Sequence, residues 1–452
     1  MVYICKDCGY STPSWLGKCP QCGEWSSFYE VQKETRKKSS PSFVSSSSPL
    51  SLAEMQGNFP RERRFSTGLK EVDRVLGGGV VEGSLILLSG DPGIGKSTLL
   101  LKIAEGIARS GRKVLYVSTE ESLHQMCLRV ERLQIERSPQ LFLLSTDDFE
   151  EIMGHLASLE PQVMVVDSIQ NLGKRETDFF PGSVALIREL SVQFMEVAKE
   201  SNVVLFLVGH VTKEGLVAGP KTLEHLVDVV LYLEGDPQRP LRMLRGMKNR
   251  FGSTQEVGIL EMREEGLSEI LDPSSYFAGD TDVSGIGTVR TILAEGKRTM
   301  MIEVQSLVNP SYLDFPRRVS LGVDLNRLHL LLAVLEKVSR VRFSRQDVYL
   351  SLGGGMRATE TALDLAVCCS VLSSRMNRAV DRSVVYCGEV SLNGEIRPVA
   401  LLEQRAQEAI RMGAKRIVTF TPHHDLPSRY QALEWSLYRH VGEALQKEGF
   451  LS

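Results

Sequence analysis

The stretch GDPGIGKST, residues 90–98, constrains the fold of this chain more than any other part of its sequence. It follows the apolar run SLILLS and precedes TLLLKIAEGIA, an order that predicts a buried strand, a glycine-rich turn and an amphipathic helix. Glycines let the backbone amides of such a turn surround a phosphate group, and the start of the helix adds its dipole. The motif predicts a nucleoside triphosphate site made by Gly90, Asp91, Pro92, Gly93, Ile94, Gly95, Lys96, Ser97 and Thr98.

The side chains expected to act on the nucleotide belong to this motif or follow nearby strands. Lys96 is expected to reach the β- and γ-phosphates, and Ser97 to ligate Mg²⁺. Asp167 ends the run VMVVD, at the edge where a parallel sheet presents ligands, and is expected as a partner of the magnesium ion. The run KVLYVSTEES brings Glu120 and Glu121 to the same edge. Glu120 is favoured as the group that orients or deprotonates water, whereas Glu121 fits a helix-capping role better.

Residues 59–268 alternate short apolar runs with amphipathic stretches such as STLLLKIAEGIARSG. Six runs are nearly continuous in apolar side chains and are expected as strands covered on both faces, at residues 84–90, 113–119, 140–146, 162–168, 203–210 and 228–235. This alternation predicts an α/β domain with a doubly wound, mostly parallel sheet.

The chain has 452 residues, more than one hydrophobic core usually organises, so a second large domain is expected. Residues 273–452 mix strands and helices without strict alternation, which predicts an α+β domain. Its expected elements are a hairpin at 288–308, helices at 327–340 and 359–374, and strands at 347–354 and 383–392.

Four of the eight cysteines lie close to the N-terminus, in two C-x-x-C pairs. Each pair can aim two sulfurs at one ion, so residues 1–30 are expected to form a structural zinc module whose ligands are Cys5, Cys8, Cys19 and Cys22. Unrelated thiols or a redox pair are the alternative. Trp15 and Trp25 are expected to pack over this module, with stacking on nucleotides as the other possibility. Residues 31–58, rich in serine and basic residues, are expected as a flexible linker.

The other cysteines are expected to be small buried side chains, which fits a reducing compartment. No apolar run approaches the length that crosses a bilayer, and the N-terminus lacks the order of a signal peptide, so a cytoplasmic protein without a membrane partner is expected. The formal charge of -3 means that any binding to nucleic acid must come from local patches.

One such patch is the segment LRMLRGMKNRFG, which holds Arg242, Arg245, Lys248 and Arg250 beside an aromatic residue. It could bind nucleic-acid phosphates, reach the γ-phosphate of a neighbouring subunit, or simply form a solvated basic face. A second patch is the stretch VTKEGLVAGPKTLEH, whose glycines, proline and lysines are typical of a mobile loop.

The chain resembles the RadA family, also called Sms, over essentially its whole length. The stretches that carry this resemblance are residues 66–104, the two cysteine pairs, LVGHVTKEGLVAGPKTLEHLVD and KNRFG. The resemblance implies a RecA-like core that uses ATP and Mg²⁺, an N-terminal module that holds Zn²⁺, and a homo-hexameric ring that migrates branches or extends strands in recombinational repair. Its implied partners are single-stranded and branched DNA and the recombinase RecA. The implied DNA-binding or coupling residues are Lys248, Asn249, Arg250, Phe251, Gly252, Lys213 and Lys221.

The stretches LSLGGGMRATETALDLAV and YCGEVSLNGEIRPVALLEQRAQEAIRMGAKRIV resemble the proteolytic domain of Lon. Active Lon uses a serine and a lysine, but Ala362 and Glu403 occupy the matching positions, and the adjacent Thr361 would need another base. The resemblance therefore implies a catalytically inactive Lon-protease-like domain at 273–452. The resemblance also implies that this domain helps to assemble the ring and offers a DNA-binding surface. The basic pairs Arg317-Arg318 and Lys415-Arg416 could contribute to that surface, although solvated surface is the preferred interpretation of each.

Two other classes of function compete with a DNA-dependent motor. One is a regulatory ATPase scaffold of the clock type, whose main partners are proteins and whose turnover ignores DNA. The other is an ATP-dependent protease, which the missing serine and lysine oppose.

Overall fold

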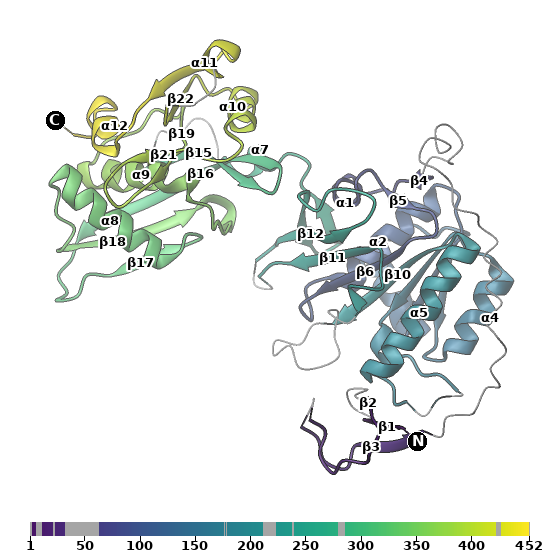
Figure 1. The fold of residues 1–452 in the computed structure, drawn as a ribbon. Helices are drawn as coiled ribbons and strands as arrows, with labels where there is room; N and C mark the ends of the chain where they lie inside the picture. Colours follow the sequence, from purple (N-terminus) through teal and green to yellow (C-terminus); the bar gives the residue numbers. More distant parts are fainter. Residues whose placement is uncertain are drawn as a thin grey trace, which may run out of the picture. The chain divides into compact units, whose positions relative to one another are not determined.

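The structure, a computed structural model, describes residues 2–5, 11–20, 23–31, 63–175, 177, 179–210, 223–236, 239–278, 285–421 and 426–451 (Figure 1). The chain divides into two compact units, Met1–Glu269 and Ile270–Ser452. Each unit is described by itself below.

The first unit is built on a large sheet, which has nine strands in the described part of the chain. The strands, in order across the sheet, are β14 (Gly266–Glu269), β13 (Val257–Arg263), β12 (Leu241–Asn249), β11 (Val229–Glu234), β6 (Leu85–Gly90), β10 (Val204–His210), β9 (Val163–Asp167), β7 (Val114–Ser118) and β8 (Leu141–Ser145). The six from β11 to β8 run parallel, whereas β12, β13 and β14 are antiparallel to their neighbours. The carboxyl ends of β6, β7, β9 and β10 therefore meet at one edge.

Helices cover both faces of this sheet. They are α1 (Lys70–Leu76), α2 (Lys96–Arg109), α3 (Leu123–Arg132), α4 (Phe149–Leu159) and α5 (Val184–Ser201), with a short 3-10 turn at Ile169–Asn171. Alternate residues of β6 point to opposite faces: Ile86 and Leu88 pack in the core with α1 and α2, and Leu85 and Leu87 pack with α4 and α5. The sheet is thus a middle layer between two apolar cores.

Two small sheets complete the described part of this unit. β4 (Arg64–Phe65) pairs with β5 (Val80–Val81), and β1 (Val2–Cys5) lies between β2 (Ser11–Thr12) and β3 (Phe28–Val31).

The six strands expected in this unit are all present, and the doubly wound α/β class is confirmed. The basic segment 241–252, for which the sequence analysis gave no secondary structure, is mostly strand β12. One expectation was wrong. β8 is not covered on both faces, because it lies at the edge of the sheet and its side chains are only partly buried.

The second unit has a mixed sheet, with seven strands among its described residues. The strands, in order, are β17 (Arg318–Leu321), β18 (Gln346–Leu352), β16 (Arg298–Pro310), β15 (Thr288–Glu295), β19 (Val384–Tyr386), β22 (Arg416–Thr419) and β23 (Glu434–Leu437). β20 (Glu389–Val390) and β21 (Ile396–Arg397) form a separate pair. The helices are α7 (Pro273–Phe277), α8 (Leu325–Ser339), α9 (Asp364–Met376), α10 (Leu402–Arg411), α11 (Leu426–Arg429) and α12 (Val441–Lys447), with 3-10 turns at Gly353–Gly355 and Thr361–Leu363.

The expected hairpin is the antiparallel pair β15 and β16, and the expected helices are α8 and α9. Cys368 and Cys369 are fully buried in α9, as expected for small apolar side chains, and burial raises the pKa of both thiols. Cys127 departs from that expectation, because it lies on an exposed position of α3. No helix in the described ranges is long and apolar enough to cross a membrane.

Candidate nucleotide site and its surroundings

The phosphate loop joins the end of β6 to the start of α2, as its sequence predicts. Gly90, Gly93 and Gly95 have φ angles of 150°, 74° and 114°, which favour glycine. A Cβ atom on Gly90 would lie 2.3 Å from the carbonyl oxygen of Leu233, so no larger residue fits there. A Cβ atom on Gly93 would meet nothing within 4 Å, so the turn is open beside this glycine.

Lys96 lies inside this loop and is almost completely buried. Its Nζ donates hydrogen bonds to the carbonyl oxygens of Gly90 and Asp91, at 2.9 Å and 3.0 Å. Burial lowers the pKa of Lys96, and the nearby carboxylates of Asp167, Asp91 and Glu120 oppose that shift. Both hydrogen-bond acceptors of the ammonium group in this loop are neutral carbonyl oxygens. An anionic phosphate would be a stronger acceptor, so the Lys96 ammonium group and the loop amides fit a phosphate.

Asp167 lies at the end of β9, beside the phosphate loop, and is largely buried. One of its carboxylate oxygens, Oδ2, accepts a hydrogen bond of 2.8 Å from the hydroxyl of Tyr116 on β7. Burial raises the pKa of Tyr116, and the negative charge of Asp167 raises it further, so the phenol remains a neutral donor. The sequence analysis missed Tyr116, since its role depends on a neighbouring strand.

The two glutamates after β7 have different surroundings. Glu120 is exposed, and its Oε1 accepts hydrogen bonds from Ser168 Oγ at 3.0 Å and Asn171 Nδ2 at 3.1 Å. Both partners follow Asp167, so these bonds hold Glu120 beside the end of β9. Glu121 instead forms an ion pair with Arg129 of α3. The capping residue of α3 is Ser122, not Glu121. The geometry favours Glu120 over Glu121 as the group that faces water in the site.

Arg242 of β12 contacts the backbone of the phosphate loop. It is only 3% exposed, and its Nε donates to the carbonyl oxygen of Ile94 at 3.0 Å. Its Nη1 donates to the carbonyl oxygens of Asp236 and Leu241, at 3.0 Å and 2.9 Å. The sequence analysis placed Arg242 in a patch that either meets a partner or is solvated. Both interpretations are wrong for this residue, because its guanidinium is buried and donates to backbone carbonyl oxygens.

The KNRFG pentapeptide, residues 248–252, forms the end of β12 and the turn after it. Lys248 Nζ donates to the carbonyl oxygens of Glu224 and Val227, at 2.7 Å and 2.8 Å. Arg250 Nη1 donates to Asp228 Oδ1 at 3.0 Å. The other oxygen of Asp228 accepts the amide of Leu85, the first residue of β6. The pentapeptide thus ties the segment after residue 222 to the strand that ends in the phosphate loop.

The remaining pentapeptide residues pack against the end of α1. Asn249 Nδ2 lies 3.3 Å from the carbonyl oxygens of both Val75 and Leu76, and Asn249 Oδ1 accepts the amide of Phe251. A Cβ atom on Gly252 would lie 3.3 Å from the Cα of Gly77, so this glycine allows a close approach of two backbones.

Several expected site residues lie outside the described residues. They are Cys8, Cys22, Lys213 and Lys221. Of the zinc-module ligands, Cys5 and Cys19 are described, and both are buried in one small core with Phe28. That shared core fits a common metal site. Trp15 and Trp25 are 56% and 72% exposed, so most of each ring faces solvent and the expected packing over the module is at best partial.

Ala362, which occupies the position of the Lon serine, lies between β18 and α9 in the second unit. Ala362 is buried, and the hydroxyl of Thr361 donates to Glu389 Oε2 at 2.6 Å. Glu403 accepts hydrogen bonds from Arg429 Nη1 at 2.9 Å and from the Tyr430 hydroxyl at 2.7 Å. No lysine or histidine is among the recorded partners of Thr361 in the described part of the unit.

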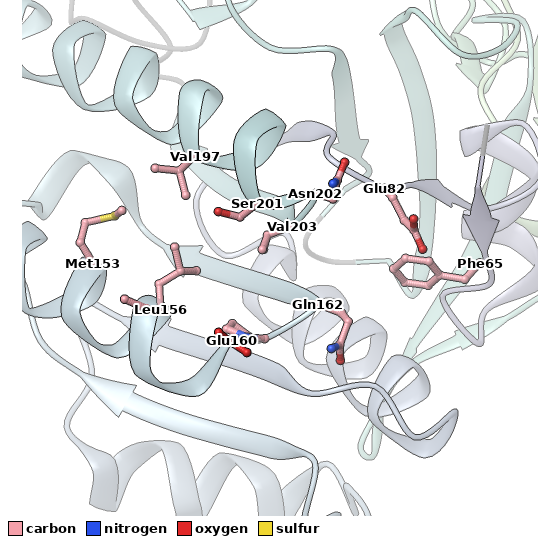
Figure 2. Close-up of a pocket in the computed structure, with 12 residues that line it drawn as sticks. Phe65, Glu82, Met153, Leu156, Glu160, Gln162, Val197, Ser201, Asn202 and Val203 are labelled. Atoms are coloured by element: carbon pink, nitrogen blue, oxygen red, sulfur yellow. The ribbon is translucent and has the colours of Figure 1, made fainter. Parts of the chain in front are cut away.

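A cavity of ≈ 660 Å³ lies beside the amino ends of β9 and β10 in the first unit (Figure 2). It is lined by the ends of α4 and α5, including Met153, Leu156 and Val197, and by the residues that precede β9 and β10. The phosphate loop follows the carboxyl end of β6, whereas this cavity lies at the amino ends of parallel strands. The cavity is therefore separate from the nucleotide site.

Three family models match separate stretches of the chain. A family model described as KaiC matches residues 65–139, one described as the rubredoxin metal binding domain matches residues 3–30, and one described as subunit ChlI of Mg-chelatase matches residues 329–423. These matches confirm the expected RecA-like core, the N-terminal zinc ribbon and the Lon-like α+β region. Among solved structures, a crystal structure of the RadB recombinase matches with a TM-score of 0.35 and 24% identity, over 45% of this chain and 99% of that chain.

Curated relatives match over almost the full length. DNA repair protein RadA of Bacillus subtilis is 43% identical over 451 residues, which are 98% of this chain and 97% of the relative. DNA repair protein RadA of Halalkalibacterium halodurans is 44% identical over 418 residues, which are 92% of this chain and 91% of the relative. DNA repair protein RadA of Synechocystis is 44% identical over 444 residues, which are 92% of this chain and 88% of the relative. The chain therefore belongs to the RadA family of DNA repair proteins.

Proposed function

We propose that this chain is a DNA-dependent ATPase of recombinational repair, a ring-shaped motor that moves on single-stranded DNA and migrates branches or extends strands. The observation that carries the proposal is the convergence of Lys96, Asp167 and Glu120 beside one phosphate loop. Membership of the RadA family supports a role in repair, and single-stranded DNA, branched DNA and RecA are its proposed partners.

The proposed nucleotide chemistry uses residues of one sheet edge. The amides of residues 90–98 would hold the phosphates of ATP, and Lys96 would exchange its two carbonyl partners for phosphate oxygens. Magnesium, when bound, supplies positive charge between the β- and γ-phosphates. Ser97 and Asp167 would hold it directly or through water. Glu120 would orient the attacking water, since it is exposed and is anchored by Ser168 and Asn171.

The pentapeptide cannot act on the nucleotide of its own subunit. Arg242 contacts the phosphate loop, and Lys248 lies six residues farther along β12, roughly 20 Å away at the rise of a strand. Lys248 and Arg250 would therefore contact either DNA or the ATP of a neighbouring copy. Contact in trans would make each nucleotide site depend on a second subunit, which supports a ring. A homo-hexamer is the proposed assembly.

The pentapeptide also supplies a path for coupling. Lys248 holds the segment that follows residue 222, and Arg250 reaches β6 through Asp228. A phosphate that draws Lys248 away from Glu224 and Val227 would release that segment. ATP binding and DNA contact would thereby be linked through one strand.

The other parts of the chain have supporting roles in this proposal. Cys5, Cys8, Cys19 and Cys22 would hold a structural zinc ion. The second unit would be a scaffold without protease activity, because Ala362 carries no nucleophile and Glu403 is paired with Arg429 and Tyr430.

Steady-state ATP hydrolysis with and without single-stranded DNA tests the proposal. Lys96→Ala is expected to lose turnover in both conditions. Lys248→Ala is expected to keep ATP binding and lose the response to DNA. The matched control is Arg245→Ala, which changes a cation of the same strand that pairs with Glu234. Thermal unfolding of each variant separates a lost contact from a lost fold, since Lys248 also holds backbone carbonyls. Turnover that ignores DNA in the wild type would contradict the motor and favour a regulatory scaffold of the clock type.

A further inference from the structure

The cavity shown in Figure 2 has an apolar wall. This wall consists of Met153 and Leu156 of α4 and Val197 of α5, which belong to or pack against the buried core on this face of the sheet. Phe65 and Glu82 lie across the cavity from them (Figure 2). The volume of ≈ 660 Å³ lies within the range of roughly 300–1,000 Å³ that is usual for ligand pockets. The cavity can therefore take a few side chains of a peptide.

The rim of the cavity is acidic. Of the described residues that line it, the charged ones are Glu82 and Glu160, both carboxylates. Glu82 is half-buried directly after β5, and Glu160 is exposed at the end of α4. Arg112 lies over the ring of Phe65, 4.3 Å from its centroid, and is not among the lining residues. An occupant that suits this cavity has apolar side chains and a positive charge.

The described chain of the first unit resumes at this cavity. Arg63 is the first described residue after residue 31, and its carbonyl oxygen accepts a hydrogen bond of 3.1 Å from the amide of Glu82. Phe65, which follows closely, lines the cavity. An extended chain of four residues spans at most about 14 Å, so Phe59 lies within that distance of Arg63. The segment that precedes Arg63 is therefore tethered at the rim of the cavity.

That segment has the composition that the cavity needs. Residues 55–61 read MQGNFPR and combine the apolar side chains of Met55 and Phe59 with one charged residue, Arg61. Residues 39–51, farther from the cavity along the chain, are rich in serine and carry no charge. The stretch nearest to the cavity is thus the one that can fill its apolar wall and meet its acidic rim.

We propose that residues 55–61 dock in this cavity of their own chain, with Met55 and Phe59 against the apolar wall and Arg61 beside Glu82. A segment tethered this closely has an effective concentration on the order of 1 mM at the cavity. If the free peptide has a dissociation constant of about 0.1 mM, the tethered segment fills the cavity about ten times as often as it leaves it open. Docking shortens the linker of the N-terminal module to residues 32–54 and limits how far that module reaches.

Trypsin cleavage of the full chain, without nucleotide or DNA, tests this contact. Cleavage after Arg61 should be slow in the wild type, and the double variant Met55→Ser/Phe59→Ser should accelerate it about tenfold, the ratio of filled to open cavity. Cleavage after Lys38, outside the docked segment, should keep its rate and serves as the internal standard. Phe43→Ser is the matched control, because it removes an aromatic ring that precedes the docked segment. Mass spectrometry of the fragments identifies each cleavage.

A change on the cavity side should have the same effect. Met153→Asp places a charge in the apolar wall and should accelerate cleavage after Arg61 as much as the double variant does. Thermal unfolding checks that Met153→Asp is folded, and the double variant leaves the core of the first unit untouched. A fluorescently labelled peptide of residues 52–62 should bind the double variant about tenfold more tightly than the wild type, where the tethered segment competes with it.

A mixed assembly shows whose cavity the segment occupies. Met153→Asp chains have an intact segment, and Met55→Ser/Phe59→Ser chains have an intact cavity. When the two are co-purified, docking within one chain predicts fast cleavage after Arg61 in both. Slow cleavage of the Met153→Asp chain in the mixture would assign the segment to the cavity of a neighbouring copy and contradict docking within one chain.

Two other results would overturn the inference. One is cleavage after Arg61 that is equally fast in the wild type and in the double variant. The other is a labelled peptide that binds the wild type as tightly as the double variant, since the tethered segment would then not occupy its site. Both measurements are made without ATP or DNA, so their outcome is independent of the proposed motor.

Discussion

The nucleotide site of the first unit and the protease-like position of the second unit hold their charged side chains in different ways. Around the phosphate loop, Lys96 donates hydrogen bonds to two backbone carbonyl oxygens, and Glu120 accepts hydrogen bonds from Ser168 and Asn171. In the second unit, two carboxylates near this position form ion pairs: Glu360 with the fully buried Arg405, and Glu403 with Arg429. A phosphate can replace the carbonyl partners of Lys96, whereas Arg405 and Arg429 are already paired with carboxylates.

This difference separates a site that can do chemistry from one that supports the fold. Arg405 also donates to the carbonyl oxygens of Ala400 and Ile292, and Glu360 accepts the amide of Ala294 at 2.7 Å. An ion pair whose arginine is fully buried and hydrogen-bonded in this way links β15 to α10. Removal of a charge should therefore affect turnover in the first unit and stability in the second.

The largest effect is expected from Glu120→Gln. Loss of the group that orients water should lower ATP turnover by about 10²- to 10⁴-fold while ATP binding is retained. Glu121→Gln is the control, since Glu121 pairs with Arg129 and should change turnover far less. Measurements of ATP turnover and nucleotide affinity on both variants show which of the two glutamates acts in hydrolysis. Equal losses in the two variants would mean that the site does not distinguish these glutamates.

The next effect concerns the stability of the second unit. Arg405→Ala should lower its free energy of unfolding by about 3–5 kcal/mol, because Glu360 would remain as an uncompensated charge among buried groups. Arg429→Ala breaks a more exposed pair with Glu403 and should cost less than about 1 kcal/mol. Urea unfolding of the full chain, followed by a probe in the second unit, measures both. A small effect of Arg405→Ala would remove the contrast between the two units.

A smaller effect is expected from Tyr116→Phe. The change leaves Asp167 Oδ2 without its donor in a buried position, at a cost of about 1.5–3 kcal/mol for a hydrogen bond to a charged group. Because Tyr116 positions Asp167 and does not touch substrate, the variant should need more Mg²⁺ for half-maximal turnover and recover activity at high Mg²⁺. A loss of turnover that Mg²⁺ does not rescue would contradict this positioning role.

Much of the first unit could be predicted because its determinants are local. The glycines and lysine of residues 90–98 are contiguous, and the buried strands are short apolar runs. β12 was missed although it alternates buried and partly exposed residues, with Arg242, Leu244 and Gly246 buried. Arginine is almost never fully buried unless it is paired, so the sequence analysis did not expect Arg242 to face the core. Without a buried residue at that position, the alternation typical of a strand could not be recognised.

The roles of Arg242 and Tyr116 could not be predicted from the sequence. Each depends on a partner brought near by the fold: Ile94 for Arg242, and Asp167 for Tyr116. Sequence analysis therefore located the motifs but not the residues that position them.

The smallest expected effect is a null result in the second unit. The double variant Ala362→Ser/Glu403→Lys restores the residue types of the Lon pair, and it should show no degradation of casein above a buffer control. The new lysine would lose the hydrogen bond from Tyr430 and face Arg429, which repels it from its former position. The new hydroxyl would replace a methyl group in a buried turn, where Ala362 is 3% exposed and a substrate has little access. Thermal unfolding must confirm that the variant is folded. Peptide cleavage by a folded variant would mean that the second unit keeps a working protease frame, and the contrast between a chemical site and a structural one would then rest on two side chains alone.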